Sequence, residues 1–112
     1  MKKLFFLILL TLFVSNVNAT ARWHTAIVQT VYPHSNGDFV IIFDKDSSYC
    51  SNSATGNKYY YVSAGQNRVN RKGVKSMLST ALTAATTKNR LSINFDDATE
   101  KCFVNRMKLS FE

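Results

Sequence analysis

One stretch decides the fold, residues 70–87, which reads NRKGVKSMLSTALTAATT. Its apolar residues recur at spacings of three and four, which places them on one face of a helix over three turns. They are Val74, Met77, Leu78, Ala81, Leu82 and Ala85. Asn70 is a suitable N-cap, and Asn89 can end the helix in the left-handed conformation. The sequence therefore predicts a single amphipathic helix from about Asn70 to Thr87.

Working outward, three extended segments precede this helix and two follow it. They are residues 22–32, 39–43, 58–63, 91–96 and 103–111, each rich in β-branched or aromatic residues. The order β-β-β-α-β-β is that of the OB-fold, a five-stranded, partly open Greek-key barrel with its helix between the third and fourth strands. The sequence thus predicts a mainly β protein with one helix, of the α+β class.

Alternation of side chains predicts which residues of each strand face the core. The first strand carries apolar residues on both faces, which indicates a long, bent strand that serves both halves of a barrel. In the third strand, Tyr59 and Tyr61 share one face and Tyr60 faces the other way with Val62. In the fifth strand, the predicted apolar face consists of Phe103, Met107, Leu109 and Phe111.

The N-terminal residues 1–19 are typical of a signal peptide. Lys2 and Lys3 provide a basic start, residues 4–14 are an apolar run, and Val17, Asn18 and Ala19 resemble a cleavage signature. The apolar run is too short for a permanent transmembrane helix. We therefore expect one OB-like domain, residues 20–112, that is secreted or periplasmic and has no membrane-spanning segment.

The chain contains two cysteines, Cys50 and Cys102. Export would place both in an oxidising compartment, where an even pair predicts one disulfide. The bridge would join the loop after the second strand to the start of the fifth strand. A reactive or metal-binding thiol pair is the alternative, but no Cys-x-x-Cys motif and no nearby histidine support it.

The chain is basic, with a formal net charge of +7, or +5 without Lys2 and Lys3. Much of the excess lies at and before the helix start, in Arg68, Arg71, Lys72 and Lys75. A helix N-terminus ordinarily favours negative charge, so these cations predict either an anion site or a solvated, solubilising face. The anion would be a phosphate, an acidic glycan or a lipid headgroup.

The helix and the strand after it also carry a resemblance to a known family. The segments Gly73–Leu82 and Leu91–Phe95, followed by Cys102, resemble the B subunits of AB5 toxins, especially the subtilase-cytotoxin and pertussis-like branch. The resemblance implies a small secreted OB-fold that forms a pentameric ring, binds cell-surface glycans and carries a separate toxic A subunit. The sugar-contacting residues of that family do not align with positions here, so the resemblance implies none.

The sequence contains little that would support catalysis. It has no phosphate-binding glycine loop, no nucleophile elbow and no histidine spacing suited to a metal, so we expect neither an enzyme nor a cofactor. The one enzyme alternative is a secreted ribonuclease with His24 and His34 as acid and base. Nucleic acid is not expected as the ligand, because the protein is expected to be exported.

A sugar-binding surface is the leading functional prediction. Aromatic rings pack on the apolar face of a pyranose, and amides and hydroxyls bind its hydroxyl groups. We place Tyr59, Tyr61, Gln66 and Asn67 near the ligand; the alternative is that they are ordinary barrel surface and loop. The sequence thus predicts a non-enzymatic binding module, with a periplasmic structural, stress or inhibitor protein as the alternative.

Overall fold

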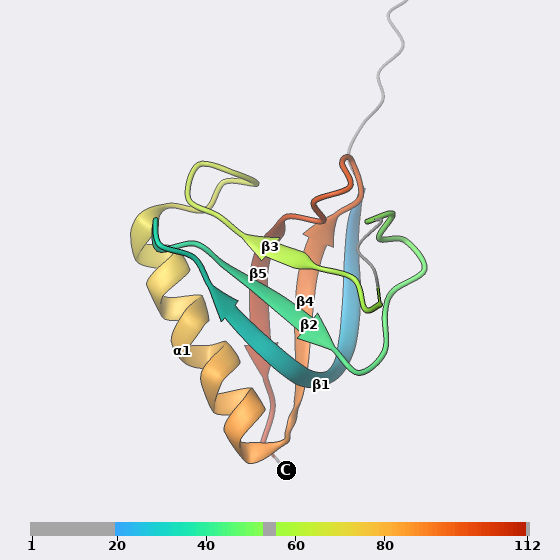
Figure 1. Cartoon of the computed structure of the whole chain (residues 1–112), viewed down its shortest axis with the longest axis vertical. Coiled ribbons are helices and arrows are strands. Elements are labelled where there is room, and N and C mark those ends of the chain that lie inside the picture. Colours follow the sequence, from blue (N-terminus) through green and yellow to red (C-terminus); the bar gives the residue numbers. More distant parts are fainter. Residues whose placement is uncertain (1–19, 53–55, 112) are drawn as a thin grey trace, which may run out of the picture.

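The structure is a computed structural model that describes residues 20–52 and 56–111, so the predicted signal peptide, residues 1–19, lies outside the described residues. The predicted element order is confirmed (Figure 1). The elements are β1 (Ala21–Pro33), β2 (Phe39–Phe43), β3 (Tyr60–Val62), α1 (Arg71–Thr87), β4 (Arg90–Asp96) and β5 (Val104–Leu109). Within the described ranges, no helix has the length and apolar character needed to cross a bilayer.

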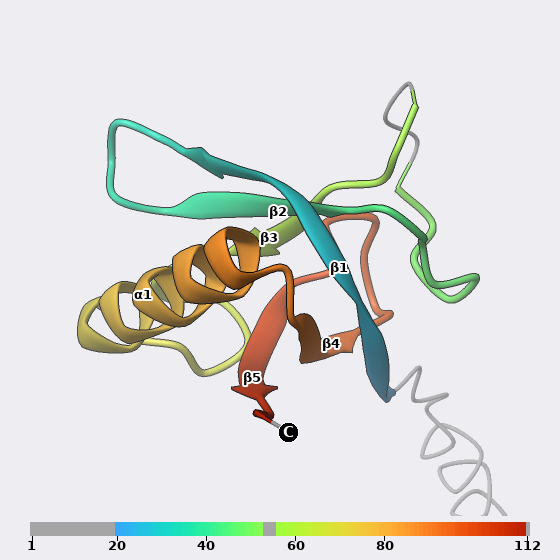
Figure 2. The same ribbon diagram turned by 90° about the horizontal axis from the view of Figure 1, so that it is seen from below.

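The five strands form one antiparallel sheet in the order β3-β2-β1-β4-β5. The sheet curls until its two outer strands approach each other. Their approach is marked by a hydrogen bond from the backbone N–H of Tyr61 on β3 to the carbonyl oxygen of Lys101, just before β5, at 3.3 Å. The helix α1 leads from β3 to β4 and lies along the barrel (Figures 1 and 2). This is the connectivity of the OB-fold, as the sequence predicts.

The central strand β1 serves both halves of the barrel. Its first half pairs with β4 and its second half pairs with β2 (Figure 2). The β1–β2 register shifts between Val28 and Thr30, so Gln29 is an extra residue on β1. The outward-facing positions are odd-numbered before Gln29 and even-numbered after it. The bent strand predicted from the sequence is therefore present, and a β-bulge turns its second half over.

The helix packs on the barrel through Val74, Met77, Ala81 and Ala84, all of which are buried. The sequence predicts Leu82 on this face, but Leu82 is 46% exposed. The buried face is rotated about the helix axis toward Ala84, whose small side chain faces the sheet. Asn70 caps the N-terminus as predicted, since its Oδ1 accepts a hydrogen bond from the Gly73 N–H at 2.8 Å. At the C-terminus, Lys88 adopts the left-handed conformation in place of Asn89.

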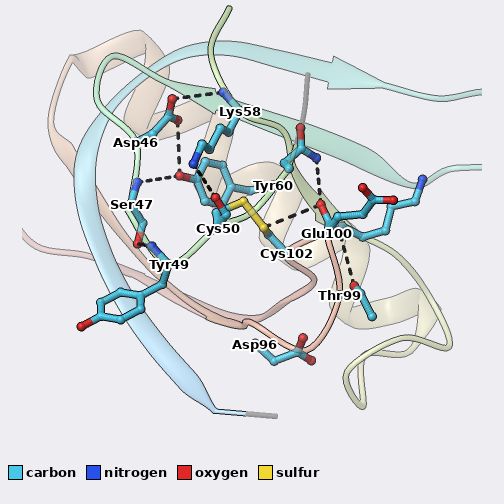
Figure 3. Close-up of a disulfide and its surroundings, with 12 residues drawn as sticks. Asp46, Ser47, Tyr49, Cys50, Lys58, Tyr60, Asp96, Thr99, Glu100 and Cys102 are labelled. Carbon is cyan, nitrogen blue, oxygen red and sulfur yellow. Dashed lines mark hydrogen bonds between the residues drawn. A yellow bond between two sulfur atoms is a disulfide. The ribbon is translucent and has the colours of Figure 1, made fainter. Parts of the chain in front are cut away.

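The core lies inside the barrel, between the sheet and α1. Its largest fully buried side chains are Tyr60, Phe39, Phe43, Phe95, Ile41, Leu91 and Ile93. Cys50 and Cys102 form the predicted disulfide, with Cα atoms 5.7 Å apart and a sequence separation of 52. It joins the β2–β3 loop to the β4–β5 loop (residues 97–103), beside Tyr60 (Figure 3).

The predicted apolar face of β5 is partly wrong. The β4–β5 register shifts between Asn94 and Phe95, which adds one residue to β5 near its start. As a result, Val104 is fully buried, whereas Phe103 lies half-buried on the outer surface. Phe111, which was expected on the same face, is 69% exposed beyond the end of the strand.

Candidate functional site

A row of aromatic rings crosses the outer surface of β1, β2 and β3. We call it the aromatic strip; it consists of Tyr32, His34, Tyr59, Tyr61 and Phe103. Each ring lies close to at least one other, with centroid separations that run from 4.8 Å for Tyr32 and His34 to 6.4 Å for His34 and Tyr61. Most of the pairs are edge-to-face, the arrangement that the ring quadrupoles favour.

The strip is held in place by the sheet beneath it. Strand pairing puts Val40 between Tyr32 on one side and Tyr61 on the other, and Val40 is fully buried although it faces away from the barrel interior. The two rings therefore cover an apolar patch of their own. Tyr32 remains 45% exposed above it, while Tyr59 and Tyr61 are half-buried. A ligand would meet a surface of rings already fixed by packing.

The strip ends at a hollow of about 380 Å³, which we call the loop pocket. Its walls come from the β1–β2 loop (residues 34–38), β3, the β3–α1 loop (residues 63–70) and the β4–β5 loop. It is lined by His34, Asp38, Tyr61, Ser63, Ala64, Gln66, Lys101 and Phe103. The ammonium group of Lys101 lies 4.6 Å from the centroid of the Tyr61 ring, so a cation borders the aromatic floor.

Asp38 ties together the loops around the pocket. Its Oδ1 accepts the Ala64 N–H at 3.1 Å and forms an ion pair with Nη1 of Arg71 at 3.0 Å. Burial raises the pKa of Asp38, but the bonds from Ala64 and Arg71 outweigh it and hold the pKa below its ordinary value. Asp38 is therefore an ionised brace between the β1–β2 loop and the start of α1.

The disulfide fixes the opposite wall of the pocket. Cys102 lies between Lys101 and Phe103, and its backbone is left-handed, with a φ of 48°. A non-glycine residue in that region is held there at some cost, and here the bridge to Cys50 holds it. The turn therefore presents Lys101 and Phe103 to the pocket from a cross-linked segment.

The structure brings together three of the four residues predicted near a ligand. Tyr61 and Gln66 line the loop pocket, and Tyr59 touches Tyr61 in the strip, with 6.2 Å between ring centroids. Asn67 is engaged elsewhere. Its Nδ2 donates to the carbonyl oxygen of Phe103 at 2.8 Å, and its own carbonyl oxygen accepts from Asn105 Nδ2 at 2.7 Å. Asn67 thus joins the β3–α1 loop to β5.

The predicted basic cluster is divided by its contacts. Arg71 is paired with Asp38, so its charge is matched within the protein. Arg68, the residue after Asn67, also has a left-handed backbone, with a φ of 67°, and its side chain is exposed. Lys72 and Lys75 are exposed on the first turns of α1.

The two histidines of the ribonuclease alternative have separate surroundings. His24 packs against Phe43 and Tyr60, and its Nε2 is 2.7 Å from the carbonyl oxygen of Lys45. His34 lies in the aromatic strip, ten residues further along the chain. The structure therefore does not bring them into one acid–base pair. Among the described residues, no group of three or more His, Cys, Asp or Glu side chains could hold a metal ion.

Sequence reasoning did not place Tyr32, Lys101 or Phe103 at this site. The sequence pattern does not predict that Tyr32 faces outward, because the bulge at Gln29 reverses the alternation of side chains along β1. The hydropathy pattern predicts Phe103 in the core, because it does not reveal the irregularity of β5 opposite Asn94 and Phe95. The tertiary fold alone brings Lys101 over Tyr61.

Comparison of the chain with family models, curated proteins and solved structures finds no significant match.

Proposed function

We propose that this protein is a non-enzymatic, exported binding module that holds a carbohydrate on the aromatic strip, with the loop pocket taking one sugar unit. The observation that carries the proposal is the unbroken chain of ring contacts from Tyr32 to Phe103, ending at a pocket with polar walls. The disulfide supports export, because such bonds persist in oxidising compartments.

The position on the fold supports the same proposal. OB-folds bind oligosaccharides and oligonucleotides on the face of strands 2 and 3, between the β1–β2 and β4–β5 loops. The strip and the pocket occupy that region here. Rings fixed by packing can take the apolar face of a pyranose without being ordered on binding, and Ser63, Gln66 and Lys101 supply polar groups beside them.

The test is a glycan array, followed by titration of the best-bound oligosaccharide with variants. Tyr59→Ala combined with Tyr61→Ala should weaken binding about tenfold or more, since each stacking ring contributes about 1 kcal/mol. Tyr49→Ala is the matched control, because Tyr49 is an exposed tyrosine, at 53%, outside the strip. Thermal melting of each variant verifies folding.

Two results would overturn the proposal in different ways. Binding that survives the double substitution would show that the sugar sits elsewhere. An array on which the wild-type protein binds no glycan would remove the carbohydrate function itself.

The toxin-subunit interpretation adds a ring-forming pentamer and a separate A subunit to this proposal. Light scattering of the purified protein distinguishes it from the periplasmic structural, stress or inhibitor alternative. A pentamer favours the first, and a strict monomer retained in the periplasm favours the second.

A further inference from the structure

A second surface, on the opposite half of the barrel, carries clustered positive charge that the proposed sugar site does not use. It is the outer face of β1, β4 and β5, where strand register sets outward side chains in rows. One row is Trp23, Asn94 and Arg106; the next is Thr25, Ser92 and Lys108; the third includes Ile27 and Arg90. With strands about 4.8 Å apart and rows about 7 Å apart, the three rows cover about 10 by 14 Å. We call this surface the cationic face.

Four cations border the cationic face, and none is neutralised within the described part of the chain. They are Lys88, Arg90, Arg106 and Lys108, all exposed. The ion pairs found among the described residues involve other cations, in Arg22–Asp97 and Arg71–Asp38. Grouping like charges without partners costs free energy in the isolated protein, and an anionic ligand would recover that cost.

Trp23 holds two of these cations in place. The Lys108 ammonium is 5.0 Å from the centroid of the indole ring, and the Arg106 guanidinium carbon is 5.8 Å from it. The ring attracts both cations through its quadrupole and so offsets part of their mutual repulsion. Trp23 itself is 50% exposed, which is unusual for so large an apolar side chain. Trp23 is therefore a positioning residue for Arg106 and Lys108 that also offers free ring surface.

Beside this group the face is hollowed. A depression of about 600 Å³ is lined by Thr25, Ile27, Lys88, Asn89, Arg90, Ser92 and Ser110. The hydroxyl groups of Thr25 and Ser92 lie 2.7 Å apart and hydrogen-bond to each other on its floor. Each hydroxyl oxygen keeps further lone pairs for a ligand, and Asn89 and Ser110 add polar groups.

Carboxylates at the two ends of this face are already engaged by the backbone. Asp44 Oδ1 accepts the Ile27 N–H at 3.1 Å, and Asp96 Oδ1 accepts the Ala98 N–H at 3.3 Å. Neither forms an ion pair with the four cations. Both carboxylates keep their charge, but they lie outside ion-pairing distance of the four cations, so the cations stay available to an anionic ligand.

We propose that the cationic face binds an acidic glycan, whose carboxylate or sulfate groups pair with Arg106, Lys108 and Arg90 while its hydroxyls meet the floor of the depression. Single-stranded nucleic acid fits less well, because it needs a series of stacking rings and this face exposes one. The depression has the volume of a site for a short oligosaccharide. This proposal is independent of the sugar site on the aromatic strip.

The probes for the test are dextran sulfate oligosaccharides, uronic-acid oligosaccharides and unmodified dextran of the same length. Arg106→Gln with Lys108→Gln should weaken binding of at least one acidic probe about tenfold or more, and unmodified dextran should bind weakly to every form. Lys72→Gln with Lys75→Gln removes the same charge from α1 and should change affinity less than about twofold. Trp23→Ala should weaken binding by a smaller factor, because it releases both cations without removing them.

Three results would overturn the proposal. Equal losses in the two double variants would mean that net charge alone attracts the anion. Equal binding of neutral dextran would remove the role of the acidic groups, and tighter binding of single-stranded DNA of matched charge would make the ligand a nucleic acid. Titrating the acidic probes into the Tyr59→Ala, Tyr61→Ala variant as well removes any contribution of the aromatic strip to the measured affinity, so failure at one face is distinguishable from failure at the other.

Discussion

Removing the disulfide by Cys50→Ala and Cys102→Ala is expected to lower the free energy of unfolding by up to about 4 kcal/mol. The magnitude follows from the sequence separation of 52 between the two cysteines, because the bridge closes that loop and so lowers the conformational entropy of the unfolded chain. For a domain of this size the loss corresponds to a fall in Tm of about 15–30 °C.

The left-handed backbone of Cys102 allows this loss to be divided into two parts. Alanine at position 102 keeps the unfavourable φ of 48° without the bridge that enforces it, whereas glycine accepts that φ freely. The pair Cys50→Ala, Cys102→Gly should therefore be about 1 kcal/mol more stable than Cys50→Ala, Cys102→Ala. The difference measures the strain of the turn separately from the effect of the cross-link.

Urea unfolding followed by circular dichroism measures both quantities. Wild-type protein unfolded in the presence of a thiol reductant is the matched control, and its stability should fall to near that of the Cys50→Ala, Cys102→Ala variant. Mass spectrometry of the untreated wild type establishes that the bridge is formed. If the bridge is formed and both alanine substitutions together cost less than about 1 kcal/mol, the entropic reasoning fails for this loop.

Two further perturbations test the polar contacts that hold the loops. Tyr60→Phe leaves the nearly buried Ser47 N–H without the acceptor it has at 2.8 Å, and should destabilise the protein by about 1–3 kcal/mol. Tyr59→Phe, on the outer face, should cost much less, and equal losses in urea unfolding would contradict this assignment. The pKa of Asp38 is held below its ordinary value of 3.8. The stability that the ionised Asp38 carboxylate contributes is therefore complete above about pH 3.8 and is lost as the pH falls through the lowered pKa. The stability gap between wild type and Asp38→Asn should therefore narrow on acidification below about pH 4, and a gap that widens would contradict the ion pair with Arg71.

The parts of the fold that depend on neighbours in sequence could be predicted. The helix could be located because its periodicity and its Asn70 cap are both local signals. The opposite orientations of Tyr60 and Tyr61 followed from strand alternation alone. The disulfide required only that the chain contain one pair of cysteines and a signature of export.

The parts that depend on bulges and on tertiary approach could not be predicted. An extra residue in a strand reverses every side chain after it, and nothing in the composition around Gln29 marks such a residue. For the same reason, Val104 and not the predicted Phe103 is buried in the core at the start of β5. Asn67 is a polar residue in a loop and so resembles a ligand-binding residue in the sequence, but its amide connects two segments that are distant in sequence.

The two proposed binding faces have a common origin in β1. Before Gln29, its odd-numbered residues Trp23 and Thr25 face outward with β4 and β5, and they form part of the cationic face. After the bulge, its even-numbered residue Tyr32 faces outward with β2 and β3, and it begins the aromatic strip. A regular strand of this length would put one of these two sets inside the barrel. The bulge therefore allows a small barrel with one central strand to present two chemically different surfaces, which substitutions can disable separately.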